Sequence, residues 1–272
     1  MSMPPDFSVA DLPMLSSPQN PRVKEYVDLR SDGNVRRERH SFFLEGRRAI
    51  EAALSIPGVK LLELIFSDHL LGDDLSLVEK ARAKSVPLVR VSKDVYKKIA
   101  DVMAPQGIAA VVRTPEWKLE DVLKARDVLL VAACGVQDPG NLGTLIRSCE
   151  ASGAAALIVL EGSADPYNAK VVRATAAGLL TLPILRMKTD EFLKAMVAAK
   201  SRMVAASAHQ GATYKSFDWR NRPITLCIGN EGDGLPAEIE TACVEKVTIP
   251  MRGSAESLNA AVAASILLFQ AM

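Results

Sequence analysis

Hydrophobic and polar residues follow two different periods along this chain. Short runs of apolar and β-branched residues predict strands, and apolar residues three or four positions apart predict helices. In the first part of the chain we expect strands at residues 41–44, 61–67, 87–91 and 108–113, with helices at 47–54, 75–84 and 93–100. This order predicts a small α/β domain over residues 18–113.

The second part of the chain is more regular. We expect strands at residues 127–133, 156–160, 182–185, 202–207, 224–228 and 247–249, alternating with helices at 141–152, 168–179 and 190–200. The first of these strands, DVLLVAA, is apolar throughout, which is typical of a parallel strand covered on both faces. Residues 127–272 therefore predict an open parallel sheet with helices on both faces.

Two segments lack these periods. Residues 1–17 contain Pro4, Pro5 and Pro13 and predict a flexible leader. Residues 114–126 are polar and charged and predict a linker between the two domains.

The chain ends in a helix that is rich in alanine. Leu258, Val262, Ile266 and Phe269 form one apolar stripe, which predicts a packed helix, and the alanines between them allow another backbone to approach closely. Ser257 lies where this helix begins, so it either caps the helix or faces a ligand there.

Composition excludes several classes of protein. The net charge of +1, with 49% hydrophobic residues, is that of an ordinary globular protein without a uniformly basic surface. We find no apolar run long enough for a membrane span and no signal-peptide pattern. The four cysteines form no CxxC pair and the three histidines lie apart from them, so we expect no metal site and reduced thiols in a cytoplasmic protein.

Positive charge gathers near the start of the first domain. Residues 17–48 hold an excess of three positive charges, which fits either RNA phosphate contacts or a solvated helical face. The candidate RNA contacts in this region are Arg22, Lys24, Arg36, Arg37 and Arg47.

Three loops of the second domain combine glycine with compact polar residues. They follow predicted parallel strands, and the carboxyl ends of such strands meet at one ligand-binding edge. Taken singly each is ambiguous, because GNEGDG lacks the glycine spacing of a dinucleotide site and could be a tight turn, and Asn141 could be a helix cap.

Taken together, the segments NLGTLIRSCEASGA, IGNEGDGL and IPMRGSAESLNAAVA resemble, in order, the three signature motifs of the SpoU/TrmH family of RNA ribose 2′-O-methyltransferases, within the SPOUT superfamily. The resemblance covers residues 127–272. The first domain, with SPQNPRVKEYVDL and FFLEGRRAIEAAL, is similar to the ribosomal-protein-like substrate-binding domain of ribosomal-RNA members.

The resemblance implies a deep trefoil knot at the C-terminus that holds S-adenosylmethionine largely by main-chain groups, without a metal. The implied cofactor contacts are Gly229, Ile249, Met251 and Leu258. The implied catalytic residues are Asn141, Arg147, Glu231, Ser257 and Asn259.

The resemblance assigns Arg147 to the target 2′-hydroxyl. A guanidinium is effectively always charged, so a role as base competes with a role as an electrostatic clamp on a phosphate or forming alkoxide. Arg173 is a further candidate RNA contact, or a surface arginine.

The family resemblance also implies a homodimer through the knotted domain. We expect the RNA to be 23S ribosomal RNA, with transfer RNA as the second choice. The rival hypotheses are a non-catalytic RNA-binding protein with the same fold and, disfavoured by the glycine spacing, a nucleotide-dependent oxidoreductase.

Overall fold

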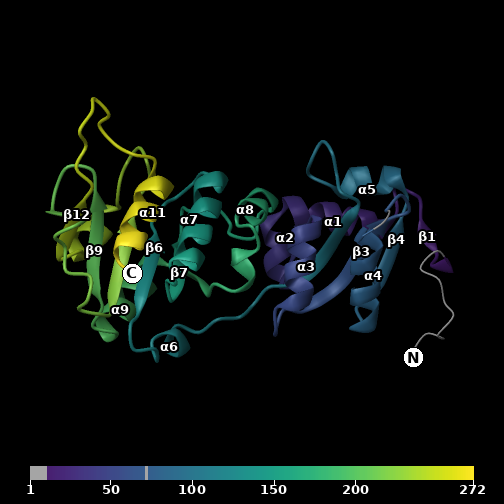
Figure 1. The fold of residues 1–272 in the computed structure, drawn as a ribbon, viewed down its shortest axis with the longest axis horizontal. Helices are drawn as coiled ribbons and strands as arrows, with labels where there is room; N and C mark the ends of the chain where they lie inside the picture. Colours follow the sequence, from purple (N-terminus) through teal and green to yellow (C-terminus); the bar gives the residue numbers. More distant parts are fainter. Residues whose placement is uncertain (1–10, 71–72) are drawn as a thin grey trace. The chain divides into compact units, whose positions relative to one another are not determined.

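The structure is a computed structural model that describes residues 11–70 and 73–272. It divides into two compact units, the first reaching Pro115 and including Tyr167–Ala169, the second formed by Glu116–Pro166 and Lys170–Met272 (Figure 1). Each unit has its own sheet. Residues 1–10 of the predicted leader lie outside the described residues, and Met14–Leu15 form a short strand, β1.

The first unit is a mixed five-stranded sheet with helices. The strands are β1, β2 (Ser41–Glu45), β3 (Leu61–Ser67), β4 (Leu88–Val91) and β5 (Ile108–Arg113). The helices are α1 (Pro21–Ser31), α2 (Gly33–Arg39), α3 (Arg47–Ser55), α4 (Asp73–Ala83) and α5 (Lys93–Ile99). The strand order is β1-β4-β3-β5-β2, in which β5 runs antiparallel to both of its neighbours.

The second unit carries the more regular pattern predicted from the sequence. Its strands are β6 (Leu129–Ala133), β7 (Ala156–Leu160), β8 (Ile184–Met187), β9 (Arg202–Ser207), β10 (Ala212–Thr213), β11 (Ile224–Ile228) and β12 (Glu245–Thr248). Its helices are α6 (Leu119–Val122), α7 (Pro139–Ala151), α8 (Ala169–Ala174), α9 (Thr189–Ala198), α10 (Ala237–Ala242) and α11 (Ala260–Gln270), with a 3₁₀ turn at Gly178–Leu180.

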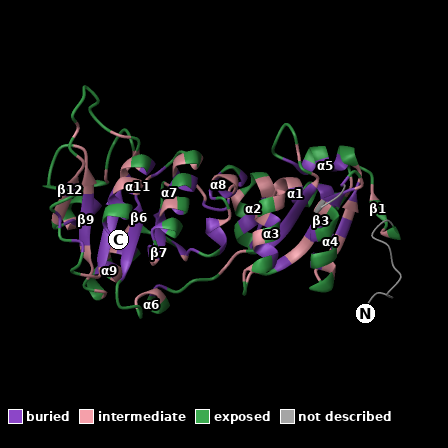
Figure 2. Ribbon diagram, viewed as in Figure 1, coloured by how far each residue is buried: buried purple, intermediate pink, exposed green. Residues whose placement is uncertain are grey.

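All seven strands of this second sheet run parallel, in the order β10-β12-β9-β11-β6-β7-β8. The central strands are buried along their length because helices cover both faces (Figure 2). The strand that follows β6 in the chain, β7, lies on one side of β6, and the later strand β11 lies on its other side. The carboxyl ends of β6 and β11 therefore border the crevice where parallel α/β sheets bind ligands.

Small residues bring the helices on one face close together. α7 and α11 lie side by side over the sheet (Figure 1), and their Ser148 and Ser265 hydroxyls are 2.7 Å apart. Ala261 and Ala264 of α11 are 2% and 0% exposed, which is the close approach that the alanines predicted. Gly143 of α7 has the same role toward α8, since a Cβ there would lie 2.4 Å from the Cβ of Ala174.

The apolar stripe of the last helix does not pack as expected within the chain. Val262 is 46% exposed and Phe269 is 53% exposed, and the buried face of α11 is formed instead by Ala261, Ala264, Leu267 and Leu268. The alanines occupy that position because they fit against α7, which leaves Val262 and Phe269 exposed and Leu258 and Ile266 half-buried. The helix is therefore packed as predicted, but Val262 and Phe269 of the predicted stripe do not take part in that packing within a single chain.

Other differences are local. The helix predicted at 168–179 ends at Ala174, because Ala176 and Ala177 adopt positive φ angles before the 3₁₀ turn. A helical turn, α6, lies in the predicted linker. The knot implied by the family resemblance stays a prediction.

Candidate functional site

Three polar side chains from distant parts of the chain meet beyond the carboxyl ends of the neighbouring strands β6 and β11. The Asn259 amide nitrogen donates to the Asn141 side-chain oxygen at 2.9 Å and to Glu231 Oε1 at 2.7 Å. The Asn141 amide nitrogen also donates to Glu231 Oε1. We call these three residues the amide–carboxylate cluster, and each comes from a different one of the three predicted loops.

Helix capping fixes this cluster in place. Asn259 is the N-cap of α11, and its Oδ1 accepts from the main-chain N–H groups of Ala261 and Val262 at 3.0 and 3.2 Å. Because Oδ1 is used in this way, the amide nitrogen of Asn259 faces Asn141 and Glu231. Ser257, the alternative cap considered from the sequence, does not cap the helix.

The cap of α7 is Asp138 rather than Asn141. The Asp138 Oδ1 atom accepts from the Asn141 main-chain N–H at 2.8 Å. The Asn141 side chain is therefore available to the cluster, and the capping role considered for it from the sequence was wrong. Asp138 was missed because its neighbour Pro139 at the first helical position was assigned to a turn.

The glycine-rich loop after β11 folds back on itself. Asn230 and Gly234 exchange two main-chain hydrogen bonds of 2.9 and 3.0 Å, and the Asn230 side chain donates to the Gly135 carbonyl at 2.9 Å. A Cβ on Gly229 would lie 2.3 Å from the Gly234 carbonyl carbon. Only glycine fits at position 229 without moving the loop.

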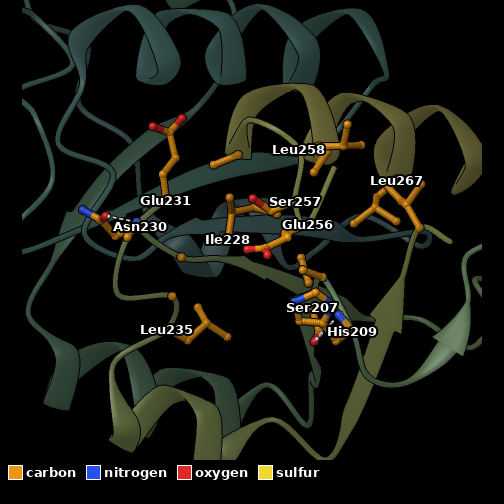
Figure 3. Close-up of a pocket in the computed structure, with 18 of the residues that line it drawn as sticks. Ser207, His209, Ile228, Asn230, Glu231, Leu235, Glu256, Ser257, Leu258 and Leu267 are labelled. Carbon is orange, nitrogen blue, oxygen red and sulfur yellow. Dashed lines mark hydrogen bonds between the residues drawn. The ribbon is translucent and has the colours of Figure 1, made fainter. Parts of the chain in front are cut away.

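A cavity of about 430 Å³ opens beside this loop. Its lining includes all four predicted cofactor contacts, Gly229, Ile249, Met251 and Leu258. Glu231 and Ser257 also line it, and both are labelled with Leu258 in Figure 3. Ile228, Val247 and Leu267 give it apolar walls. The size and the mixture of apolar and main-chain surface are typical of a small-molecule site.

The sequence missed several residues of this lining. His209 and Ser207 reach the cavity from the end of β9, and Glu256 reaches it from the loop before α11. Their position at the carboxyl end of a parallel strand was the available signal for Ser207 and His209. Glu256 lies inside a recognised motif, but it was passed over there.

A second cavity of about 220 Å³ borders the first. Gly229, Asn230, Glu231 and Ala260 line both cavities, and Asn141 and Gln137 line only the smaller one. Glu231 thus places the amide–carboxylate cluster where the two cavities meet, and Asn259, which lines neither cavity, is joined to this point by its hydrogen bonds. Polar side chains at this border can orient a hydroxyl group held in one cavity toward a group held in the other.

Arg147 lies apart from the cluster within one chain. It is exposed on α7, lines neither cavity, and makes no hydrogen bond or ion pair with any residue that the structure describes. Its role at the target hydroxyl stays a prediction.

The predicted RNA contacts of the first unit have different environments. Arg22 pairs with Glu63 at 2.9 Å, and Glu63 also accepts from the Tyr26 hydroxyl at 2.6 Å. Burial, reinforced by the Glu63 carboxylate, raises the pKa of Tyr26. Arg47 pairs with Asp74 at 3.3 Å, and Arg37 donates to Asn34. Lys24 is exposed and makes no ion pair with another described residue.

Arg173 and Arg36 are both engaged within the chain. Arg173 lies in the last turn of α8, where it is half-buried and has a partner, and its contact with RNA stays a prediction. Arg36 is 4% exposed, and its guanidinium donates to the carbonyls of Leu29 and Arg30 at 2.9 and 2.8 Å. Arg36 joins α2 to the end of α1, so its assignment as an RNA contact was wrong.

Replacing Arg36 by alanine is expected to lower the free energy of unfolding by about 2–3 kcal/mol, because buried carbonyls lose a charged donor. Urea denaturation followed by circular dichroism measures this. Lys24→Ala is the matched control and is expected to change stability by less than about 0.5 kcal/mol. Equal stability of the two variants would contradict the structural role of Arg36.

The described residues contain neither a metal-ligand cluster nor a membrane-spanning helix. No group of three or more His, Cys, Asp or Glu side chains is arranged to hold a metal ion among residues 11–70 and 73–272. None of the helices in that same part of the chain is long and apolar enough to cross a bilayer. All four cysteines are buried and free.

Comparison with known families gives two matches. Residues 128–269 match the SpoU rRNA Methylase family, and residues 20–110 match the MRM3-like substrate binding domain.

Known proteins resemble the chain over nearly its whole length. It is 32% identical to the 23S rRNA (guanosine(2553)-2′-O)-methyltransferase RlmP of Bacillus subtilis, over 94% of this chain and 97% of that protein. It is 31% identical to the 23S rRNA (uridine(2479)-2′-O)-methyltransferase of Streptomyces viridochromogenes, over 93% of this chain and 90% of that protein.

The fold of the chain is also similar to solved structures of rRNA methyltransferases. The AdoMet-bound rRNA methyltransferase from Sinorhizobium meliloti superposes with a TM-score of 0.85 at 31% identity, covering 95% of this chain and 97% of that one. The SpoU methyltransferase AviRb from Streptomyces viridochromogenes, in complex with AdoMet, superposes with a TM-score of 0.82 at 31% identity, covering 93% of this chain and 97% of that one.

Proposed function

Because this chain belongs to the SpoU rRNA methylase family, we propose that it transfers a methyl group from S-adenosylmethionine to a ribose 2′-hydroxyl in 23S ribosomal RNA, as a cytoplasmic enzyme. Relatives that act on 23S ribosomal RNA cover nearly the whole chain, including its substrate-binding domain. Transfer RNA is the second candidate, because some relatives carry the broader name of tRNA/rRNA methyltransferase.

The observation that carries the proposal is the amide–carboxylate cluster at the border of two cavities. A transferase that joins a donor to an acceptor must hold the two reactants in neighbouring sites. Glu231 lines both cavities, Asn141 lines the smaller one, and Asn259 is hydrogen-bonded to both residues; the family resemblance implies a catalytic role for all three.

The larger cavity suits S-adenosylmethionine better than a dinucleotide. Among the described residues that line it there is no lysine or arginine, which a pyrophosphate group would favour, and there are three carboxylates. Gly229 provides a close main-chain approach, and Ile228, Val247 and Leu267 provide apolar contact for an adenine ring. Gly229, Ile249, Met251 and Leu258 would hold the cofactor, which supplies an activated methyl group on its sulfonium.

The smaller cavity would receive the target ribose. Asn141 and Asn259 each present an amide beside the Glu231 carboxylate, so the cluster can both donate to and accept from a hydroxyl group. Ser257 lines the donor side of the border. These residues orient the 2′-oxygen, and Arg147 stabilises the negative charge that develops as its proton leaves.

Arg147 would reach the site through a homodimer. It is exposed on α7, and α11, packed beside α7, carries an apolar stripe in which Val262 and Phe269 are exposed and Ile266 is half-buried. An exposed apolar stripe of this kind is typical of a protein interface. Pairing two chains through this surface would bury the stripe and bring Arg147 of one chain toward the cavities of the other.

Methyl transfer and ligand binding test the proposal together. Purified protein is incubated with tritiated S-adenosylmethionine and 23S ribosomal RNA from a strain that lacks the gene, and methylated riboses are mapped. We expect label at a single ribose. Label in transfer RNA alone would favour the second candidate, and cofactor binding without transfer to either RNA would favour a non-catalytic RNA-binding protein.

Thermal-shift titration separates the remaining rival. S-adenosylmethionine is expected to stabilise the protein and NAD is not, because binding to the folded state raises its melting temperature. Gly229→Val is the matched control, since its side chain would overlap Gly234 and remove the cofactor-induced shift. Stabilisation by NAD instead would favour an oxidoreductase.

A further inference from the structure

The donor cavity has an unbalanced charge. Glu231, Asp233 and Glu256 line it, and the described lining contains no lysine or arginine to offset them. Such a cavity attracts positively charged ligands and repels anions.

The three carboxylates are not equivalent. Glu231 accepts hydrogen bonds from Asn141 and Asn259, so its charge is shared with the amide–carboxylate cluster. All three residues are exposed, and Asp233 lies at the tip of the glycine-rich loop. Glu256 makes no hydrogen bond or ion pair with any residue in the described ranges, and its carboxylate lies among the lining residues, between Ile228 and Ser207 (Figure 3).

An unpartnered carboxylate matters because the proposed reaction changes the charge of the ligand. S-adenosylmethionine carries a positive sulfonium. Transfer of the methyl group to the ribose oxygen leaves the sulfur as a neutral thioether in S-adenosylhomocysteine, while the hydroxyl proton passes to solvent. A carboxylate in the cavity therefore stabilises the donor more than the product, and this difference remains after all other contacts are matched.

We infer that Glu256 makes the donor cavity selective for the charged methyl donor over its neutral product. This inference rests on the proposed function, because it assigns S-adenosylmethionine to that cavity. The consequence for turnover is that methyl transfer itself weakens the binding of the spent cofactor, which favours its exchange for a new donor.

Isothermal titration calorimetry with three ligands tests the inference. The ligands are S-adenosylmethionine, S-adenosylhomocysteine and sinefungin, which carries a protonated amine in place of the methylsulfonium. Glu256→Gln is expected to weaken both charged ligands about three- to tenfold and to leave S-adenosylhomocysteine within about twofold of its original affinity. Retained binding of S-adenosylhomocysteine also shows that the variant cavity is folded.

Two control variants separate position from overall charge. Glu256→Asp keeps the carboxylate and is expected to keep most of the preference for charged ligands. Glu238→Gln removes the same charge from the exposed start of α10, outside the cavity lining, and is expected to leave the ratio of affinities unchanged.

The outcomes are distinct. An unchanged affinity ratio in Glu256→Gln, or equal weakening of all three ligands, would overturn the role of Glu256 and leave the proposed function intact. Failure of the unmodified protein to bind S-adenosylmethionine would overturn the proposed function, and the inference with it.

Discussion

Replacing Arg147 by alanine is expected to lower kcat/KM for RNA methylation by about a thousandfold, while the Kd for S-adenosylmethionine stays within about twofold. We expect kcat/KM to fall without a change in Kd because Arg147 lines neither cavity of its own chain, so it is not part of the donor site. A guanidinium near the target hydroxyl would stabilise the oxygen as its proton leaves, and this interaction is strongest in the transition state. Single-turnover methylation and calorimetry measure the two quantities.

The variant Arg147→Lys distinguishes the two roles left open for this residue. If Arg147 is an electrostatic clamp, lysine keeps the charge and loses the planar fork, so we expect a rate about 10- to 100-fold below the original with an unchanged pH profile. If Arg147 is the base, lysine shifts the pH profile because an ammonium loses its proton far more readily. Arg220→Ala, at an exposed arginine that lines neither of the two cavities, is the matched control and is expected to keep full activity.

The sequence predicted where the three loops meet, because they follow strands of a regular parallel sheet. The bounds of β7, β9 and β11 were predicted to the residue, since each is an apolar or β-branched run that ends at a polar or glycine position. Parallel strands place their carboxyl ends at one edge, so Asn141, Glu231 and Asn259 could be expected to meet there. Their hydrogen bonds confirm that they do.

The wrong or missed predictions concern residues whose type does not determine whether they are buried or which residues they contact. Arg36 lies in a basic segment like its neighbours, and only the packing of α2 against the end of α1 makes it a buried donor to main-chain carbonyls. The two-residue strands β1 and β10 were missed because such short edge strands have no recognisable period. For α11, period alone could not tell whether alanines or larger apolar residues face the neighbouring helix.

The second prediction with a large expected effect is the recovery of methylation activity in a dimer that combines two inactive variants. We expect Arg147→Ala and Glu231→Ala to be nearly inactive as separate homodimers, and the purified mixed dimer to recover about half of the original activity. If Arg147 of one chain completes the cavities of the other, a mixed dimer contains one site with both defects and one site with none. If Arg147 acts within its own chain, both sites carry one defect and no activity returns. Glu231→Ala is suited to this test because Glu231 caps no helix.

The exposed stripe of α11 supplies the control for this experiment. Introducing Phe269→Glu into both chains places a charge on the 53% exposed apolar residue of the proposed interface, so it is expected to prevent pairing and to remove the recovered activity. Two different affinity tags isolate the mixed dimer, and native mass spectrometry verifies its composition. An intact mixed dimer without recovered activity would contradict completion of the site by the second chain. Recovery by a species shown to be monomeric would contradict the dimer itself, because Arg147 and the amide–carboxylate cluster would then have to meet within one chain.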